Sequence, residues 1–330
     1  MYVATDQNDS RLNESGIARV CALAGGVGGA KLAAGLQAVL SPGDLSVVVN
    51  TADDFDLWGL RICSDLDTVM YTLAGFANTE TGWGVANESF AVLAMISVYG
   101  EDTWFKLGDK DLATHILRTQ RLRSGRRLME VTAGLAAALG VRSTLLPMCD
   151  EPVSTVLKTR AGLLDFQEYF VRRGQRDEVL GVELRGIDKA CIPAGVARAI
   201  AEAEAIVLCP SNPVVSIGPI LAVPGMRELL ANSSAPKVAV SPIVGGQAIK
   251  GPADRMLRSL GHEVSAVGVA RLYAGIVDGM VIDRIDEGEE EHISALGMRV
   301  FATDTVMRDE AGRECLAREV RHFCLRLGVR

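Results

Sequence analysis

Residues 18–31 read ARVCALAGGVGGAK, and this stretch decides the fold. Its first half, Ala18 to Ala24, is a short apolar run that is typical of a buried strand. Ala30 to Leu40 then carries apolar residues at helical spacing and stops at a Ser-Pro-Gly turn. Leu45 to Val49 is a second continuous apolar run, as expected for a strand covered on both faces. The chain therefore opens with a βαβ unit that has a glycine loop after its first strand.

The same alternation of strand and helix patterns continues along the chain. The later apolar runs that we expect to be strands are Arg142–Leu146, Ala205–Leu208, Lys237–Val240 and Met280–Ile282. Helical patterns such as Ile192–Ala203 and Ala253–Leu260 separate them. This predicts an α/β fold, Rossmann-like and doubly wound, with a mostly parallel sheet. Residues 83–140 read as consecutive helices, so we expect a flexible tail over 1–17 and a single domain over 18–330 with an inserted helical lobe.

The composition excludes several classes of protein. Apolar residues make up 48% of 330, which is enough for a substantial core, but no apolar stretch reaches the roughly 18 to 20 residues of a membrane span. The 41 acidic and 34 basic residues give a net charge of -7, which argues against a nucleic-acid partner. The first residues lack the pattern of an export signal, and the seven cysteines form no C-x-x-C pair. We therefore expect a cytoplasmic protein with reduced, buried thiols and no membrane partner.

The glycine loop after the first strand has the features of a phosphate cradle. Glycines let the backbone approach a phosphate, the start of the helix offers free N–H groups, and a lysine adds a positive charge. We favour this reading over a purely structural turn, with Gly26, Val27, Gly28, Gly29 and Lys31 as the binding residues. Ala30 and Leu32 flank the lysine where a Walker loop needs glycine and Ser/Thr, and Lys31 occupies the third glycine position of the dinucleotide fingerprint. An ATPase or an NAD-dependent dehydrogenase is therefore disfavoured.

An acidic cluster follows the second strand. Its members are Asp53, Asp54, Asp56, Asp65 and Asp67. Ligands of open α/β sheets bind beyond the carboxyl ends of the strands, so this cluster should face the glycine loop across a cleft. Carboxylates repel a phosphate unless a hard cation bridges them, which makes Mg²⁺ the expected cofactor. The alternative for Asp65 is that it, or Ser64, caps a helix over Leu66–Ala74.

A charged loop at Phe105 to Asp111 precedes another helical pattern. Lys106 is of interest because apolar residues flank it. Asp109 and Asp111 fit helix caps as well as they fit a site, and a lone His115 on such a helix is more often a packing residue.

The loop Cys209 to Ile220 directly follows an expected strand. Its prolines fix the turn, while Ser211, Asn212 and Ser216 present the neutral donors and acceptors that a base or phosphate edge requires. We expect this loop to face the ligand.

Several blocks of sequence, in one order from about Val20 to at least Tyr273, resemble the 2-phospho-L-lactate transferase (CofD) family. They include AGGVGGAKL (24–32), SDLDTVMYTLAG (64–75), KLGDKDLATH (106–115), CPSNPVVSIGPI (209–220) and SPIVGGQAIKGPA (241–253). The resemblance implies transfer of a phosphorylated C3 acid from a guanosine-diphosphate-activated donor to the ribityl hydroxyl of 7,8-didemethyl-8-hydroxy-5-deazariboflavin (FO). The reaction releases GMP and belongs to coenzyme F(420) biosynthesis.

The resemblance also implies roles for individual residues. Asp67 and Asp65 would be catalytic, and Asp67 and Lys106 would bind FO. Asp53, Asp54, Asp65 and Asp67 would hold Mg²⁺, the glycine loop would bind the donor phosphates, and Ser211 and Asn212 would meet the guanosine. The family further suggests a homodimer, and it leaves open whether the donor carries 2-phospholactate, phosphoenolpyruvate or 3-phosphoglycerate.

The main alternative is a nucleotide-sugar-binding regulatory protein of the gluconeogenesis-factor type, which shares the glycine loop and an acidic turn. The segments Asp65-Leu66-Asp67-Thr68 and Lys106-Leu107-Gly108-Asp109 favour the transferase, because that regulatory group lacks the first of them.

Overall fold

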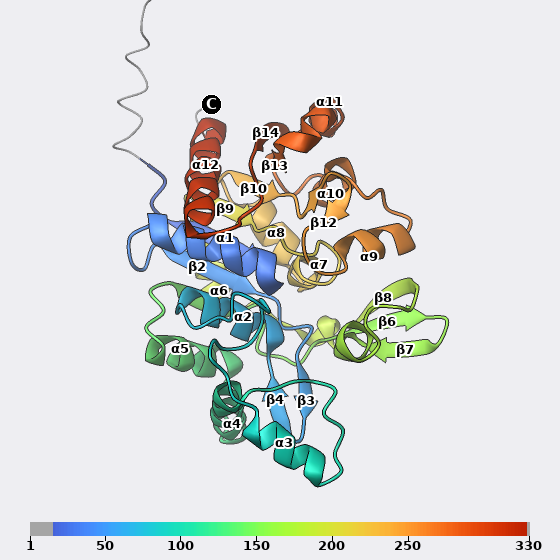
Figure 1. Ribbon diagram of the computed structural model, residues 1–330. Helices are drawn as coiled ribbons and strands as arrows, with labels where there is room; N and C mark the ends of the chain where they lie inside the picture. The colour runs from blue at the N-terminus through green and yellow to red at the C-terminus, as the bar shows by residue number, and fades with distance from the viewer. Residues whose placement is uncertain (1–15, 329–330) are drawn as a thin grey trace, which may run out of the picture.

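The computed structural model describes residues 16–328, which are built around a seven-stranded sheet (Figure 1). The strand order is β14-β13-β10-β9-β1-β2-β5, and every neighbouring pair is parallel. These strands are β1 (Val20–Ala24), β2 (Leu45–Val49), β5 (Thr144–Pro147), β9 (Ala205–Leu208), β10 (Lys237–Val240), β13 (Gly279–Asp283) and β14 (Arg299–Thr303). The predicted Rossmann-like, doubly wound α/β fold is confirmed.

The order of the strands reverses direction beside β1. The chain moves outward from β1 to β2 and β5 on one side, and then returns to place β9 against the other side of β1. The loops that leave β1 and β9 consequently turn away from each other, which opens a crevice beyond their carboxyl ends. The glycine loop and the loop after Leu208 border this crevice.

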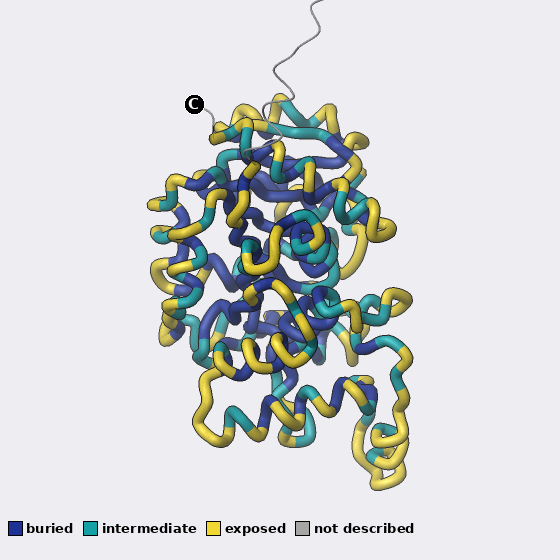
Figure 2. The backbone as a smooth tube through the Cα atoms, turned by 90° about the vertical axis from the view of Figure 1, so that its left-hand side faces the viewer, coloured by how far each residue is buried: buried dark blue, intermediate teal, exposed yellow. Residues whose placement is uncertain are grey.

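Helices cover both faces of the sheet. One face carries α1 (Gly26–Val39), α2 (Ser64–Leu73), α5 (Leu128–Ala138) and α12 (Glu310–Gly328). The other carries α6 (Ala194–Glu202), α7 (Ile217–Ala222), α8 (Met226–Ala231), α9 (Ala253–Ser259), α10 (Ala266–Tyr273) and α11 (Glu290–Ser294). In β1, Ala22 and Ala24 pack into the first core while Cys21 and Leu23 pack into the second. Burial on both faces explains why the strands read as continuous apolar runs, and Figure 2 shows the buried residues gathered in the interior.

The helices within the predicted lobe at 83–140 divide into two groups. The helix α5 packs on the core of the main sheet. The helices α3 (Ala91–Val98) and α4 (Asp109–Arg123) instead lie beside the hairpin of β3 (Phe55–Leu57) and β4 (Leu60–Ile62), at the bottom of Figure 1. The projecting part is therefore smaller than the expected segment.

A second, three-stranded sheet was not expected from the sequence. It is antiparallel, in the order β7-β6-β8, and consists of β6 (Ser154–Thr159), β7 (Gly162–Asp165) and β8 (Val179–Arg185). A π-helix at Glu168–Arg172 follows β7. The remaining elements are the small hairpin of β11 (Ile243–Val244) and β12 (Gln247–Ala248) and the 3₁₀ turns at Ile187–Lys189 and Arg284–Glu289.

The structure differs from the expectations at the start of the chain and at two cysteines. Most of the predicted tail, residues 1–15, lies outside the described residues. Ile17 is buried, and its carbonyl accepts a hydrogen bond of 2.6 Å from Arg321 on α12, so the ordered chain begins before residue 18. All seven cysteines are free, but Cys191 and Cys315 are exposed, and the expectation that all are buried was wrong for these two. Among residues 16–328, no helix combines the length and the hydrophobicity of a membrane span.

Candidate functional site

A cavity of about 690 Å³ lies at the carboxyl ends of the parallel strands. Its lining follows five of them in turn: Gly25–Gly28 after β1, Asp53 after β2, Pro210–Asn212 after β9, Ser241 after β10 and Thr305–Met307 after β14. This is the crevice in which open α/β sheets bind ligands.

The glycine loop forms one side of the cavity. Gly26, Val27, Gly28 and Lys31 line it, as the phosphate-cradle interpretation requires. The Nζ atom of Lys31 donates a hydrogen bond of 3.0 Å to the carbonyl of Met307. Burial, followed by the charges of Arg313 and Lys250, lowers the pKa of Lys31. Positive charges therefore converge on this side of the cavity.

Two glycines of the loop are required by close packing. A Cβ atom on Gly28 would stand 2.2 Å from the carbonyl oxygen of Pro210, and one on Gly29 would stand 2.4 Å from Ser211 Oγ. Gly29 is not among the residues that line the cavity. For Gly29 the structure thus supports a packing role, in which the absence of a side chain lets α1 approach the loop after β9.

The loop after β9 is fixed to the glycine loop by hydrogen bonds. Ser211 Oγ donates to the carbonyl of Gly25 at 2.8 Å and accepts from the Gly25 N–H at 3.0 Å. Asn212 Oδ1 accepts from the backbone N–H of Val214, which stabilises the turn. Ser211, Asn212 and Ser216 all line the cavity.

Two aspartates of the predicted cluster meet at the cavity. Asp53 and Asp65 both line it, and one side-chain amide, that of Asn50, donates to Oδ2 of each, at 3.1 and 3.0 Å. Burial, followed by the neighbouring Asp65 carboxylate, raises the pKa of Asp53 well above its usual value. Burial also raises the pKa of Asp65, to about 6. A pair of buried carboxylates with raised pKa values is suited to binding a cation or accepting a proton.

Asp54 does not line the main cavity. Together with Asp53 it lines a smaller neighbouring cavity of about 350 Å³, and its nearest charged partner is Arg61, at 3.8 Å. Neither of its carboxylate oxygens has a hydrogen-bond partner among residues 16–328, and burial raises its pKa to about 7.

Asp67 also lies apart from the main cavity and forms a buried ion pair with Arg118 of α4. Arg118 Nη1 donates to Asp67 Oδ2 at 2.9 Å, and Nη2 donates to Oδ1. Arg118 is 1% exposed. The four aspartates that we expected to bind one metal ion therefore do not lie together. Only Asp53 and Asp65 line the main cavity.

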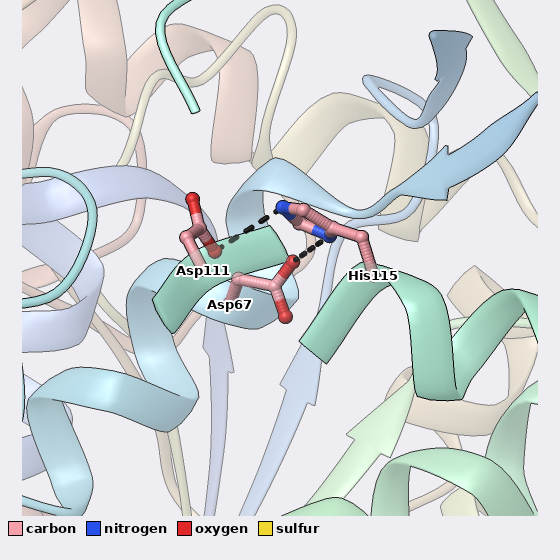
Figure 3. A group of neighbouring side chains, drawn as sticks. All are labelled: Asp67, Asp111 and His115. Carbon is pink, nitrogen blue, oxygen red and sulfur yellow. Dashed lines mark ion pairs between the residues drawn. The ribbon is translucent and has the colours of Figure 1, made fainter. Parts of the chain in front are cut away.

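Figure 3 shows a second group of potential ligands around Asp67. His115 lies between two carboxylates, with Nδ1 at 3.6 Å from Asp67 Oδ2 and Nε2 at 3.1 Å from Asp111 Oδ1. The guanidinium of Arg118 is also 3.1 Å from His115 Nδ1. A permanent cation thus already sits against this group, which argues for a structural ion-pair network here and against a metal ion.

Asp109 is a helix-capping residue, but it caps α3 and not the helix that follows it in the sequence, α4. Its carboxylate accepts hydrogen bonds of 3.0 Å from the N–H groups of Ala91 and Val92 at the start of α3. Asp111 instead accepts from the hydroxyl of Tyr71 at 2.8 Å, which joins α4 to α2. Both residues therefore have structural partners.

Five aromatic side chains also line the cavity. They are Trp83, Trp104, Phe105, Phe166 and Phe170. The rings of Phe166 and Phe170 stack with centroids 5.4 Å apart, and the π-helix after β7 supplies the second of them. Lys106, which is exposed, lines the cavity next to Phe105. No local sequence pattern marks these aromatics as one group, whereas Asn50 could have been found because it directly follows an apolar run.

The parallel sheet and the cavity at its strand ends define a Rossmann-like α/β protein with a ligand site at the switch of strand order. The chain matches the family model described as 2-phospho-L-lactate transferase CofD over residues 20–320. It is 43% identical to a phosphoenolpyruvate transferase of Streptomyces griseus subsp. griseus, over 91% of this chain and 96% of that one. It is 40% identical to a 2-phospho-L-lactate transferase of Methanosarcina acetivorans, over 88% of this chain and 95% of that one.

The chain therefore belongs to the 2-phospho-L-lactate transferase CofD family, and it is a transferase of the phosphoenolpyruvate/2-phospholactate type. A solved structure of a UPF0052 family member from Bacillus halodurans has the same fold. Its TM-score is 0.63 at 16% identity, and the match covers 93% of this chain and 99% of that one.

Proposed function

We propose that this cavity binds FO together with a guanosine-diphosphate-activated C3 acid and transfers the phosphorylated acid to the ribityl hydroxyl of FO, in coenzyme F(420) biosynthesis. The observation that carries the proposal is that three kinds of group line one cavity. They are the glycine loop with Lys31, a set of aromatic rings, and the Asp53–Asp65 pair joined by Asn50. An anionic diphosphate, a flat ring and a reacting hydroxyl need these three kinds of surface.

The transfer is an in-line displacement at the phosphorus that carries the C3 acid. A bond forms between the ribityl oxygen and this phosphorus, the bond to the bridging oxygen breaks, and GMP leaves. Asp65, which lines the cavity, would accept the hydroxyl proton. Lys31 and the N–H groups of the glycine loop would neutralise the phosphate charge. Lys106 would contact FO beside the aromatic rings.

The carboxylate pair also fits the expected Mg²⁺. Asp53 lines the cavity, and its buried Oδ1 has no hydrogen-bond partner among residues 16–328, which leaves a hard oxygen for a cation. We propose that Asp53 and Asp65 hold Mg²⁺, which would supply charge stabilisation for the phosphates. Asp54 and Asp67, the other members of the predicted set, do not line this cavity, and Asp67 is paired with Arg118.

We expect one of three activated donors to yield an FO-linked product. The purified protein would be incubated with FO, Mg²⁺ and the 2-phospholactate, phosphoenolpyruvate or 3-phosphoglycerate derivative of GDP. Mass spectrometry should then show FO enlarged by the phosphorylated acid, with GMP in equal amount. Reactions without FO serve as controls. GMP release without an FO-linked product, or no turnover with any donor, would contradict the proposal.

We also propose that the protein forms a homodimer through α3. This helix reads AVLAMISV, has no charged residue and buries none of its side chains, while the adjoining Tyr99 is 78% exposed. Only Leu93 and Ile96 of this helix are half-buried, and an apolar helix with so much exposed surface normally packs against another surface.

Light scattering should therefore give twice the chain mass of 35.1 kDa for the wild type and the mass of one chain for Met95→Glu. Leu180→Glu, at an exposed apolar residue of β8, is the matched control and should remain dimeric. A wild type with the mass of one chain at all concentrations would refute the dimer, and a dimeric Met95→Glu would refute the role of α3.

A further inference from the structure

Asn50 occupies a central place in the site. It is the first residue after β2 and is fully buried. Its Oδ1 accepts a hydrogen bond of 2.9 Å from the backbone N–H of Ala52, which fixes the orientation of the amide. Its Nδ2 then points at three acceptors, namely Asp53 Oδ2, Asp65 Oδ2 and, at 3.2 Å, the carbonyl of Val215. The Asn50 side chain thereby links the carboxyl end of β2, the start of α2 and the loop after β9.

Asn50 contacts only Oδ2 of each carboxylate. Asp53 Oδ1 accepts no hydrogen bond from residues 16–328. Asp65 Oδ1 faces the glycine loop, 3.7 Å from where a Cβ atom on Gly26 would stand. Two buried carboxylates repel each other, and a neutral donor between them reduces the repulsion without filling the coordinating oxygens.

We propose that Asn50 is the positioning residue of the candidate cation site, which rests on the proposed function of Asp53 and Asp65. It holds Oδ2 of both carboxylates so that both Oδ1 atoms are presented together. Its hydrogen bond to the carbonyl of Val215 also fixes the Asp53–Asp65 pair relative to the loop that carries Ser211, Asn212 and Ser216. Residues that orient metal ligands commonly change metal affinity when they are replaced.

The test measures binding of Mn²⁺ alone to the full-length protein, by electron paramagnetic resonance of the free ion. Mn²⁺ stands in for Mg²⁺ because both prefer carboxylate oxygens. Asn50→Leu keeps a similar volume but removes the amide, and we expect the affinity to fall by about 10- to 100-fold. Asp53→Asn, which removes a proposed ligand, should lose binding at least as strongly.

A matched control separates positioning from general loss of stability. Gln37→Leu removes another amide, one that donates to the carbonyl of Leu73 at 2.8 Å away from the cavity. It should keep the wild-type Mn²⁺ affinity even if thermal unfolding shifts as much as in Asn50→Leu. Should Asn50→Leu fail to fold, as judged by circular dichroism, Asn50→Ser replaces it, because a serine hydroxyl is too short to span both carboxylates.

The outcomes are distinguishable. A folded Asn50 variant with unchanged Mn²⁺ affinity, beside an Asp53→Asn protein that has lost binding, overturns the role of Asn50 alone. A wild type that binds no Mn²⁺, or an Asp53→Asn protein that binds it normally, overturns the cation site of the proposed function. Weakened binding in the Asn50 variant with normal binding in Gln37→Leu supports the inference.

Discussion

Replacement of Asp65 by asparagine is expected to lower kcat by about 10²- to 10⁴-fold, the usual contribution of a positioned general base. The new amide has nearly the same shape but accepts no proton, and it presents one weaker ligand to a cation. Because Asp65 lines the cavity beside the glycine loop, its carboxylate is placed to accept the hydroxyl proton. GMP release under saturating FO and donor is the measurement.

Asp56→Asn provides the comparison within the same acidic cluster. The Asp56 side chain is 72% exposed on the β3–β4 hairpin, with Arg61 at 3.7 Å, so its loss should leave kcat almost unchanged. An Asp65→Asn protein with near wild-type kcat would exclude Asp65 as the base.

The second large effect concerns Asp67 and Arg118. Replacing either partner alone by leucine should lower the free energy of unfolding by about 3–5 kcal/mol, because a buried charge is left without its counter-charge. The pair is nearly inaccessible to water, with both carboxylate oxygens bonded to the guanidinium. The double replacement Asp67→Leu/Arg118→Leu should recover most of this loss. Chemical denaturation of the four proteins gives the coupling energy.

Turnover of the stable double variant then decides the role of Asp67. The family resemblance assigns this residue to catalysis and FO, while the structure shows its carboxylate committed to Arg118. A stable but inactive double variant supports the contact with the acceptor. Restored turnover together with restored stability shows that Asp67 only joins α2 to α4. A double variant as unstable as the single ones would contradict the ion-pair argument.

Six of the seven strands of the main sheet were predictable because their signals are local, whereas β14 was not expected. Continuous apolar runs such as Ala205–Leu208 and Lys237–Val240 match β9 and β10 residue for residue. The antiparallel elements were missed. β3 and β4 have three residues each and lie inside the acidic segment, and β6 to β8 are partly exposed. Their pairing depends on contacts between segments far apart or on short turns, which apolar runs do not reveal.

The place of the site was also predictable, since parallel strands bring their carboxyl ends to one edge. The division of the aspartates was not recognised. Asp65 and Asp67 both lie in the first turn of α2. Side chains two positions apart point in directions that differ by roughly 200° around a helix of 3.6 residues per turn. If one faces the cavity, the other faces away, and Asp67 accordingly meets α4. The aromatic residues come from separate segments, so no pattern in the sequence connects them.

The cavity is enclosed by residues from Gly25 near one end of the chain to Met307 near the other. A bound molecule therefore touches parts of the polypeptide that only complete folding brings together. Such a molecule binds the folded state and not the unfolded one. Its binding should therefore raise the temperature of unfolding and slow proteolysis of the whole chain. A fragment that ends before β14 would lack one border of the cavity and with it the means to close around a substrate.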